Sequence, residues 1–123
     1  MRFDVLTLFP ELFQGYLTQS ILKLALDRGL VSINLWDIRA WAAGKHRSVD
    51  DRPFGGGPGM VIMPGPVFDA VEAVRQQDAE PGQLVLLTPA GERLNQQLVQ
   101  ELATKRRLIP GRFNPRRDGS ARL

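Results

Sequence analysis

The chain of 123 residues contains no cysteine and only one histidine, His46. Without thiols it forms no disulfide and no zinc–thiolate centre, and a single imidazole excludes a histidine cluster as a metal site. No apolar run approaches the roughly 18 residues of a membrane-spanning helix. The N-terminus also lacks the charged start and long apolar stretch of a signal peptide. These absences predict a cytoplasmic protein that binds no metal and no membrane.

The composition and length are those of one folded domain, because 43% of the residues are apolar and 24% are charged. The charge is distributed unevenly. From Lys105 onward the chain carries a net charge of +6, so the preceding residues carry −3 of the total of +3. A basic segment of this kind is typical of an electrostatic arm for nucleic acid. An accident of how the chain ends is the alternative.

The pattern of apolar residues predicts strands that alternate with helices. We expect strands over residues 2–8, 30–36 and 83–87, and a further strand from Leu108 that is cut short by Pro110 and Gly111. Helices are expected from Pro10, from an N-cap at Ser20 to a stop at Gly29, over residues 66–76, and over 94–102 with a cap at Asn95. This alternation favours an α/β domain with a mainly parallel sheet and flanking helices. In such sheets, ligands bind beyond the carboxyl ends of the strands.

The most unusual stretch is residues 48–60, which combine four glycines and two prolines with the adjacent carboxylates Asp50 and Asp51. Such a run does not suit the interior of a helix or strand and predicts a shaped loop near a ligand. It is not a P-loop, because Gly59 is followed by Met60 rather than lysine, and it lacks the glycine spacing of a dinucleotide fingerprint. From its residues alone, the run is either an unassigned binding loop or a structural one.

Residues 50–60, DDRPFGGGPGM, closely resemble the signature loop of the bacterial tRNA (guanine-N1)-methyltransferases. The segments LTLFPELF (6–13), LLTPAG (86–91) and ELAT (101–104) resemble other parts of that family in the same order. The resemblance covers about residues 1–109 and identifies them as the N-terminal part of the methyltransferase domain. Residues 110–123 diverge as a basic tail, which we interpret as a truncation or a reading-frame change. A natural short paralogue is the alternative.

The resemblance implies the trefoil-knotted α/β methyltransferase fold, with an incomplete knot in this chain, and a homodimer. It also implies transfer of a methyl group from S-adenosylmethionine to N1 of the guanine immediately 3′ of the tRNA anticodon. Guanine N1 must lose a proton in this reaction, so a base is needed nearby. No residue here matches the family's catalytic aspartate, and no catalytic residue is assigned; Asp50 and Asp51 are the alternative bases.

The same resemblance implies two groups of binding residues. The cofactor-binding positions that match the family are Leu86, Leu87, Thr88, Pro89 and Gly91, with Gly111 and Phe113 as echoes of a later segment. The substrate-binding positions are Asp50, Arg52, Gly55, Gly56, Gly57 and Gly59, with His46 and Arg47 as contacts to RNA phosphates. From the residues alone, the alternatives are an ordinary strand and turn, a salt-bridged loop and a solvated histidine.

Two further interpretations of the chain on its own remain open. One is a non-catalytic RNA-binding fragment, and the other is a poorly folded truncation product. In the second, a sheet cut at Ile109 has an unpaired edge and an uncovered apolar face at Val85, Leu87 and Leu98.

Overall fold

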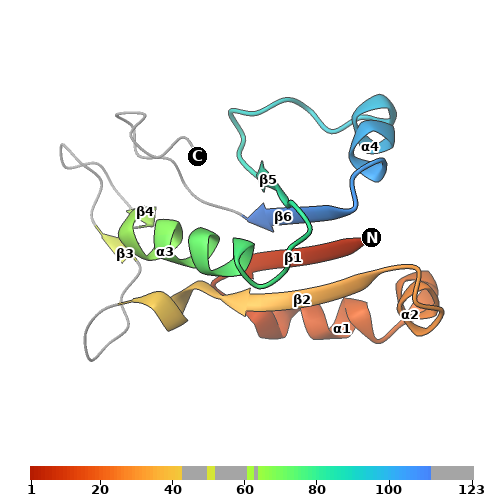
Figure 1. Ribbon diagram of the computed structural model, residues 1–123, viewed down its shortest axis with the longest axis horizontal. Coiled ribbons are helices and arrows are strands. Elements are labelled where there is room, and N and C mark those ends of the chain that lie inside the picture. Colours follow the sequence, from red (N-terminus) through yellow and green to blue (C-terminus); the bar gives the residue numbers. More distant parts are fainter. Residues whose placement is uncertain (43–49, 52–60, 63, 112–123) are drawn as a thin grey trace.

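A computed structural model describes residues 1–42, 50–51, 61–62 and 64–111. Its main element is a four-stranded sheet in the order β2-β1-β6-β5, in which all neighbouring strands are parallel (Figure 1). The strands are β1 (Arg2–Thr7), β2 (Ser32–Asp37), β5 (Gln83–Leu86) and β6 (Arg107–Gly111). The short strands β3 (Asp50–Asp51) and β4 (Val61–Ile62) form a separate antiparallel pair. The predicted α/β class with a mainly parallel sheet and flanking helices is confirmed.

Helical segments connect these strands. The connection from β1 to β2 contains the 3₁₀ helix η1 (Pro10–Phe13) and the helices α1 (Gln14–Leu17) and α2 (Ser20–Asp27). After β2 come η2 (Ile38–Trp41) and, further along, α3 (Pro64–Arg75), while α4 (Gln96–Ala103) joins β5 to β6. In Figure 1, α3 lies in front of the sheet, α1 and α2 lie on its β2 side, and α4 lies on its opposite side. None of the helices in the described ranges has the length and apolar character needed to cross a bilayer.

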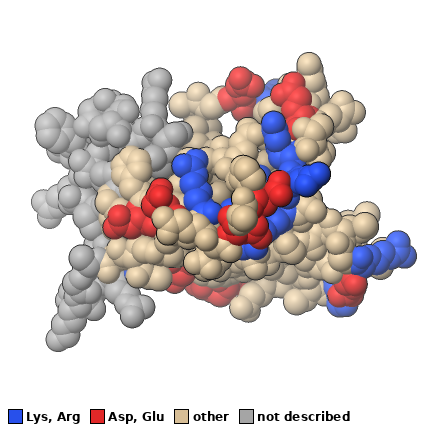
Figure 2. Space-filling model, in the orientation of Figure 1, with Lys and Arg blue, Asp and Glu red and all other residues tan. Residues whose placement is uncertain are grey.

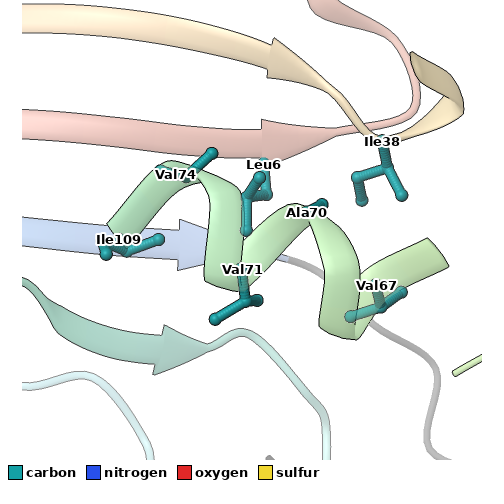
Figure 3. Packing of buried hydrophobic residues seen from close by; sticks show 7 residues of the cluster. All are labelled: Leu6, Ile38, Val67, Ala70, Val71, Val74 and Ile109. Carbon is teal, nitrogen blue, oxygen red and sulfur yellow. The ribbon is translucent and has the colours of Figure 1, made fainter. Parts of the chain in front are cut away.

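The core lies between α3 and the sheet. Apolar residues of α3 recur at helical spacing and face Leu6 of β1, Ile109 of β6 and Ile38 of η2 (Figure 3). The α3 residues in this cluster are Val67, Ala70, Val71 and Val74. Trp36 and Trp41 pack against the same cluster, so in this structure both tryptophans serve the core. The helix α3 therefore packs against two strands, β1 and β6, and against η2.

A buried ion pair lies beside this core. Arg107, at the start of β6, donates from Nε to Asp4 Oδ2 of β1 at 2.7 Å, and both side chains are fully buried. The other guanidinium nitrogens donate to four backbone carbonyls, two of them (Val74 and Arg75) in the last turn of α3. A cation at this place interacts favourably with the carbonyl end of the helix. The pair thus ties two strands to the end of α3.

Asp4 accepts three further hydrogen bonds, two from Arg2 (Nε at 2.9 Å and Nη2 at 3.2 Å) and one from Trp36 Nε1 at 3.0 Å. Burial opposes ionisation of this carboxyl group, but the hydrogen bonds from Arg2, Trp36 and Arg107 outweigh burial and hold the pKa of Asp4 below its ordinary value. Asp4 is therefore a carboxylate that three donor side chains satisfy, and its position within the sheet gives it a structural role.

The expectation that Pro110 and Gly111 cut the last strand is wrong. Both belong to β6, which lies between β1 and β5, so the edges of the sheet are β2 and β5 and no unpaired edge arises at Ile109. The pairing with β5 is continuous through Pro110 and Gly111, whereas that with β1 is interrupted opposite Ile109 and Pro110. Proline lacks an N–H, and the strand accommodates it by giving up ladder positions on one side only.

The predicted helix ends have mixed outcomes. Ser20 is not an N-cap but the first residue of α2, with φ 61°, and Gln19 occupies the cap position. Asn95 is confirmed as the cap of α4, because its Oδ1 accepts the N–H of Leu98 at 2.8 Å. Gly29 is confirmed as the stop of α2: it has φ 70°, and its N–H donates to Leu26 O.

Candidate functional site

The carboxyl ends of β5 and β6 lie side by side. The side of the sheet at which the parallel strands end is called the carboxyl edge, as distinct from the outer strands β2 and β5. Leu86, the last residue of β5, pairs with Gly111, the last residue of β6, and Gly111 is also paired with Leu6 of β1. The ladder continues one residue further, because the Leu87 N–H donates to Gly111 O at 2.9 Å. The predicted cofactor residues before and after α4 are therefore brought together, although a chain segment of more than twenty residues separates them.

The residues after β5 form a tight turn. The Gly91 N–H donates to Thr88 O at 3.1 Å, and the Ala90 N–H lies 3.4 Å from Thr88 Oγ1. Thr88 thus holds the turn with both its carbonyl and its hydroxyl. Pro89 and Gly91 are exposed, and 53% of Leu87 is exposed although it is apolar. Of the three residues of the predicted uncovered apolar face, Leu87 is exposed, whereas Val85 and Leu98 are only partly exposed.

An exposed leucine beside fixed backbone groups is the kind of surface that binds a small ligand with an apolar part and a few polar atoms. Thr88–Gly91 is ordered by its own hydrogen bonds, so binding there would cost little conformational entropy. In the described ranges no group of His, Asp and Glu side chains is arranged to hold a metal ion. The carboxyl edge thus combines an exposed apolar side chain with an ordered turn.

The signature segment, residues 50–60, begins in β3 of the small antiparallel sheet and is followed directly by β4. Asp50 pairs with Ile62 and Asp51 with Val61, so these two aspartates are in a strand, and the prediction that the loop includes them is wrong. Residues 52–60 connect the two strands and lie outside the described residues. The other predicted site residues outside the described ranges are His46, Arg47, Arg52, Gly55, Gly56, Gly57, Gly59 and Phe113. Their roles remain predictions.

A second pair of residues lies at the carboxyl edge, beyond β1 and β2. The guanidinium carbon of Arg39 lies 5.6 Å from the centre of the Phe9 ring. The sequence indicates no site at either residue: Phe9 lies within the family segment LTLFPELF, and Arg39 belongs to no predicted motif. The signal that was available is their position, since each follows a strand of the same parallel sheet directly.

The charges of the described residues do not mark an RNA-binding face by themselves. On the face shown in Figure 2, acidic and basic side chains are interspersed rather than gathered into one basic patch. Of the predicted basic tail, residues 112–123 lie outside the described residues. Its role as an electrostatic arm remains a prediction.

Comparison with known proteins gives a uniform result. The family model described as tRNA (Guanine-1)-methyltransferase TrmD matches residues 1–116. The tRNA (guanine-N(1)-)-methyltransferase of Chloroflexus aurantiacus is 56% identical over 109 residues, which are 89% of this chain and 43% of that protein. The enzyme of the same name from Rhodopirellula baltica is 52% identical over 110 residues, covering 89% of this chain and 46% of the relative.

Among solved structures, tRNA (m1G37) methyltransferase from Aquifex aeolicus is similar with a TM-score of 0.80 and 37% sequence identity. The similarity covers 90% of this chain and 50% of the Aquifex chain. The chain therefore spans about half the length, or somewhat less, of the relatives that it matches.

Proposed function

The chain belongs to the tRNA (guanine-N1)-methyltransferase family, and from this premise we propose that it provides the S-adenosylmethionine-binding part of an enzyme that methylates tRNA. The target atom is N1 of the guanine immediately 3′ of the anticodon. The observation that supports this proposal is the hydrogen bond between Gly111 and Leu87, the residue before the turn Thr88–Gly91, since in parallel sheets ligands bind beyond the carboxyl ends of the strands.

The described residues fit the cofactor in chemical terms. The half-exposed Leu87 offers apolar contact to a purine or to the methionine chain, and the ordered turn offers backbone polar groups to the ribose and amino acid parts. The cofactor supplies an electrophilic methyl group when it is bound. The protein's task is then to orient guanine N1 in line with that group and to accept the N1 proton.

The base that accepts this proton is not assigned. Asp50 and Asp51 lie at the start of the signature segment and are the carboxylates of this chain proposed for that task, if the chain carries out transfer alone. In the proposal, Arg52, the loop glycines, His46 and Arg47 contact the guanine and its neighbouring phosphates. The protein would meet this tRNA in the cytoplasm. The trefoil knot remains a prediction, since it involves chain beyond Gly111.

We also propose a homodimer. Support comes from apolar side chains that η1, α1 and α2 leave exposed, because a surface of this kind is typical of a protein interface. These residues are Leu12, Tyr16, Ile21 and Leu24. Sedimentation analysis at micromolar concentration tests this point: a dimer is expected, and a purely monomeric, folded chain would remove this part of the proposal.

The cofactor part of the proposal is tested by calorimetric titration of the chain with S-adenosylmethionine. We expect saturable binding at one site per chain, and Leu87→Glu is expected to weaken it by about tenfold or more, equivalent to about 1.4 kcal/mol. The side chain of Leu87 projects from a turn whose hydrogen bonds involve only the backbone and Thr88, so the substitution spares the fold. A carboxylate at this position replaces an apolar contact by a charge that binding would desolvate.

The control is Leu30→Glu, at an exposed leucine that follows α2. The Leu30 carbonyl accepts a hydrogen bond from the amino group of Met1, so this residue lies at the amino ends of the strands, away from the carboxyl edge. It should leave the affinity for S-adenosylmethionine unchanged. A folded chain that gives no binding heat, or equal losses in the two variants, would contradict the proposed cofactor site.

A further inference from the structure

Phe9 and Arg39 form a pair at the same edge of the sheet as the candidate cofactor turn. Phe9 lies two residues beyond the end of β1, and Arg39 lies two residues beyond the end of β2. The two strands are parallel neighbours with Thr7 opposite Asp37, so both residues emerge from the carboxyl edge. In the order β2-β1-β6-β5, Phe9 follows a strand that is two strand spacings, roughly 10 Å, from β5, and Arg39 follows a strand that is three spacings, roughly 14 Å, from it.

The backbone of each residue is fixed on both sides. The Phe9 N–H donates to Thr7 Oγ1 at 3.1 Å, and its carbonyl accepts the N–H of Leu12 at 3.1 Å. The Arg39 N–H donates to Asp37 Oδ1 at 2.9 Å, and its carbonyl accepts the N–H of Ala42 at 3.1 Å. The aromatic ring and the guanidinium group are thus presented by ordered turns, which lowers the entropy cost of binding a partner.

The core does not need the Phe9 ring. The buried cluster is formed by residues of β1, β6, η2 and α3, and Phe9 is not among the side chains that pack against it. Phe9 as a residue is 47% exposed, and the Arg39 guanidinium lies near its ring. An accessible aromatic ring beside a cation is typical of proteins that bind single-stranded RNA, because bases stack on aromatic rings and phosphates pair with arginine.

We propose that Phe9 and Arg39 together bind a nucleotide of the tRNA anticodon loop that neighbours the methylated guanine. Phe9 supplies a stacking surface for the base, and Arg39 supplies the positive charge for the adjacent phosphate. This inference rests on the proposed function, because it takes tRNA as the substrate. It adds a contact that stands beyond the signature segment and the cofactor turn. The other interpretation is that Arg39 merely covers an apolar ring at the surface.

The test is fluorescence anisotropy of a labelled RNA hairpin with the anticodon-loop sequence, titrated with the 123-residue chain over a series of salt concentrations. Phe9→Leu is expected to lower the affinity by about tenfold, since stacking on an aromatic side chain contributes on the order of one or more factors of ten, and to leave the salt dependence unchanged. Arg39→Gln is expected to lower the affinity and to reduce the slope of log K against log salt by about one.

Two controls match these variants. Phe68 of α3 has the same exposed fraction as Phe9, 47%, so Phe68→Leu removes an equally accessible ring and should leave RNA binding unchanged. Arg28, the exposed C-cap of α2, is the control for charge. Arg28→Gln should change the slope of log K against log salt less than Arg39→Gln does. Phe9→Trp should retain or strengthen binding, a result that a purely structural ring would not give.

Equal RNA affinity of the unaltered chain, Phe9→Leu and Arg39→Gln would overturn the inference, because the pair would then only shield the surface. Loss of affinity with an unchanged salt slope in Arg39→Gln would overturn the phosphate contact. If the chain binds S-adenosylmethionine but no RNA, the inference fails while the cofactor site stands. If RNA binds but S-adenosylmethionine does not, the cofactor proposal fails and the variants still decide the role of the pair.

Discussion

Replacing Asp4 with asparagine is expected to lower the free energy of unfolding by about 3–5 kcal/mol, because it leaves the buried Arg107 without its counter-ion. The guanidinium keeps its four backbone carbonyl partners, but the charge within the sheet is no longer neutralised. Chemical denaturation followed by circular dichroism measures the change. The matched control is Asp27→Asn, which removes the exposed pair with Lys23 and should cost less than about 1 kcal/mol.

The dependence on pH follows from the same residue. The folded chain holds the pKa of Asp4 below the value of about 3.9 for an unfolded aspartate, so its contribution to stability is present above that value and is lost as the pH falls through the folded pKa. The stability difference between the unaltered chain and Asp4→Asn should therefore shrink below about pH 4. A constant difference between pH 7 and pH 3 would show that the ionised form of Asp4 is not what the structure stabilises.

Replacing Leu6 with alanine is expected to destabilise the fold by about 2–5 kcal/mol. Leu6 is fully buried among α3 residues, Ile38 and Ile109, so its removal leaves a cavity in the packing between helix and sheet (Figure 3). The matched control is Leu30→Ala, since Leu30 is 63% exposed and lies outside the proposed dimer surface, and its cost should stay within about 0.5 kcal/mol.

This comparison also tests whether the chain is folded cooperatively on its own. A single sharp transition for the unaltered chain and a large shift for Leu6→Ala alone would contradict the interpretation as a poorly folded truncation product. Small and similar changes in the free energy of unfolding for both variants, with broad transitions, would support that interpretation instead. In a loosely packed chain, the loss of one buried side chain changes stability little.

The order of strands and helices was predictable because apolar periodicity and turn residues are local signals. The strands at β1, β2 and β5, the cap at Asn95 and the stop at Gly29 each follow from a few neighbouring residues. The place of β6 was not predictable in this way. Pro110 is a local signal against a strand, and the pairing that overrides it comes from Val85, which is distant in sequence.

In the candidate site, too, some features follow from the local sequence and others depend on pairing between distant residues. The resemblance identified Leu87 and Thr88, but only the parallel pairing shows that Gly111 lies beside them. Phe9 and Arg39 were missed because their significance depends on two neighbouring strands that end at the same level, with Thr7 opposite Asp37. Asp4 and Arg107 are a similar case: neither sequence neighbourhood indicates a buried ion pair between residues so far apart in the chain.

The most direct test of the central claim is a chimera in which residues 1–109 of this chain replace the matching segment of the Chloroflexus aurantiacus relative. Transfer of labelled methyl groups from S-adenosylmethionine to a tRNA transcript is then measured. We expect methylation at guanine N1, none when adenine replaces that guanine, and a loss of about tenfold or more with Leu87→Glu. A folded chimera that binds tRNA but transfers no methyl group would contradict the claim that these residues form the cofactor-binding part of a tRNA (guanine-N1)-methyltransferase.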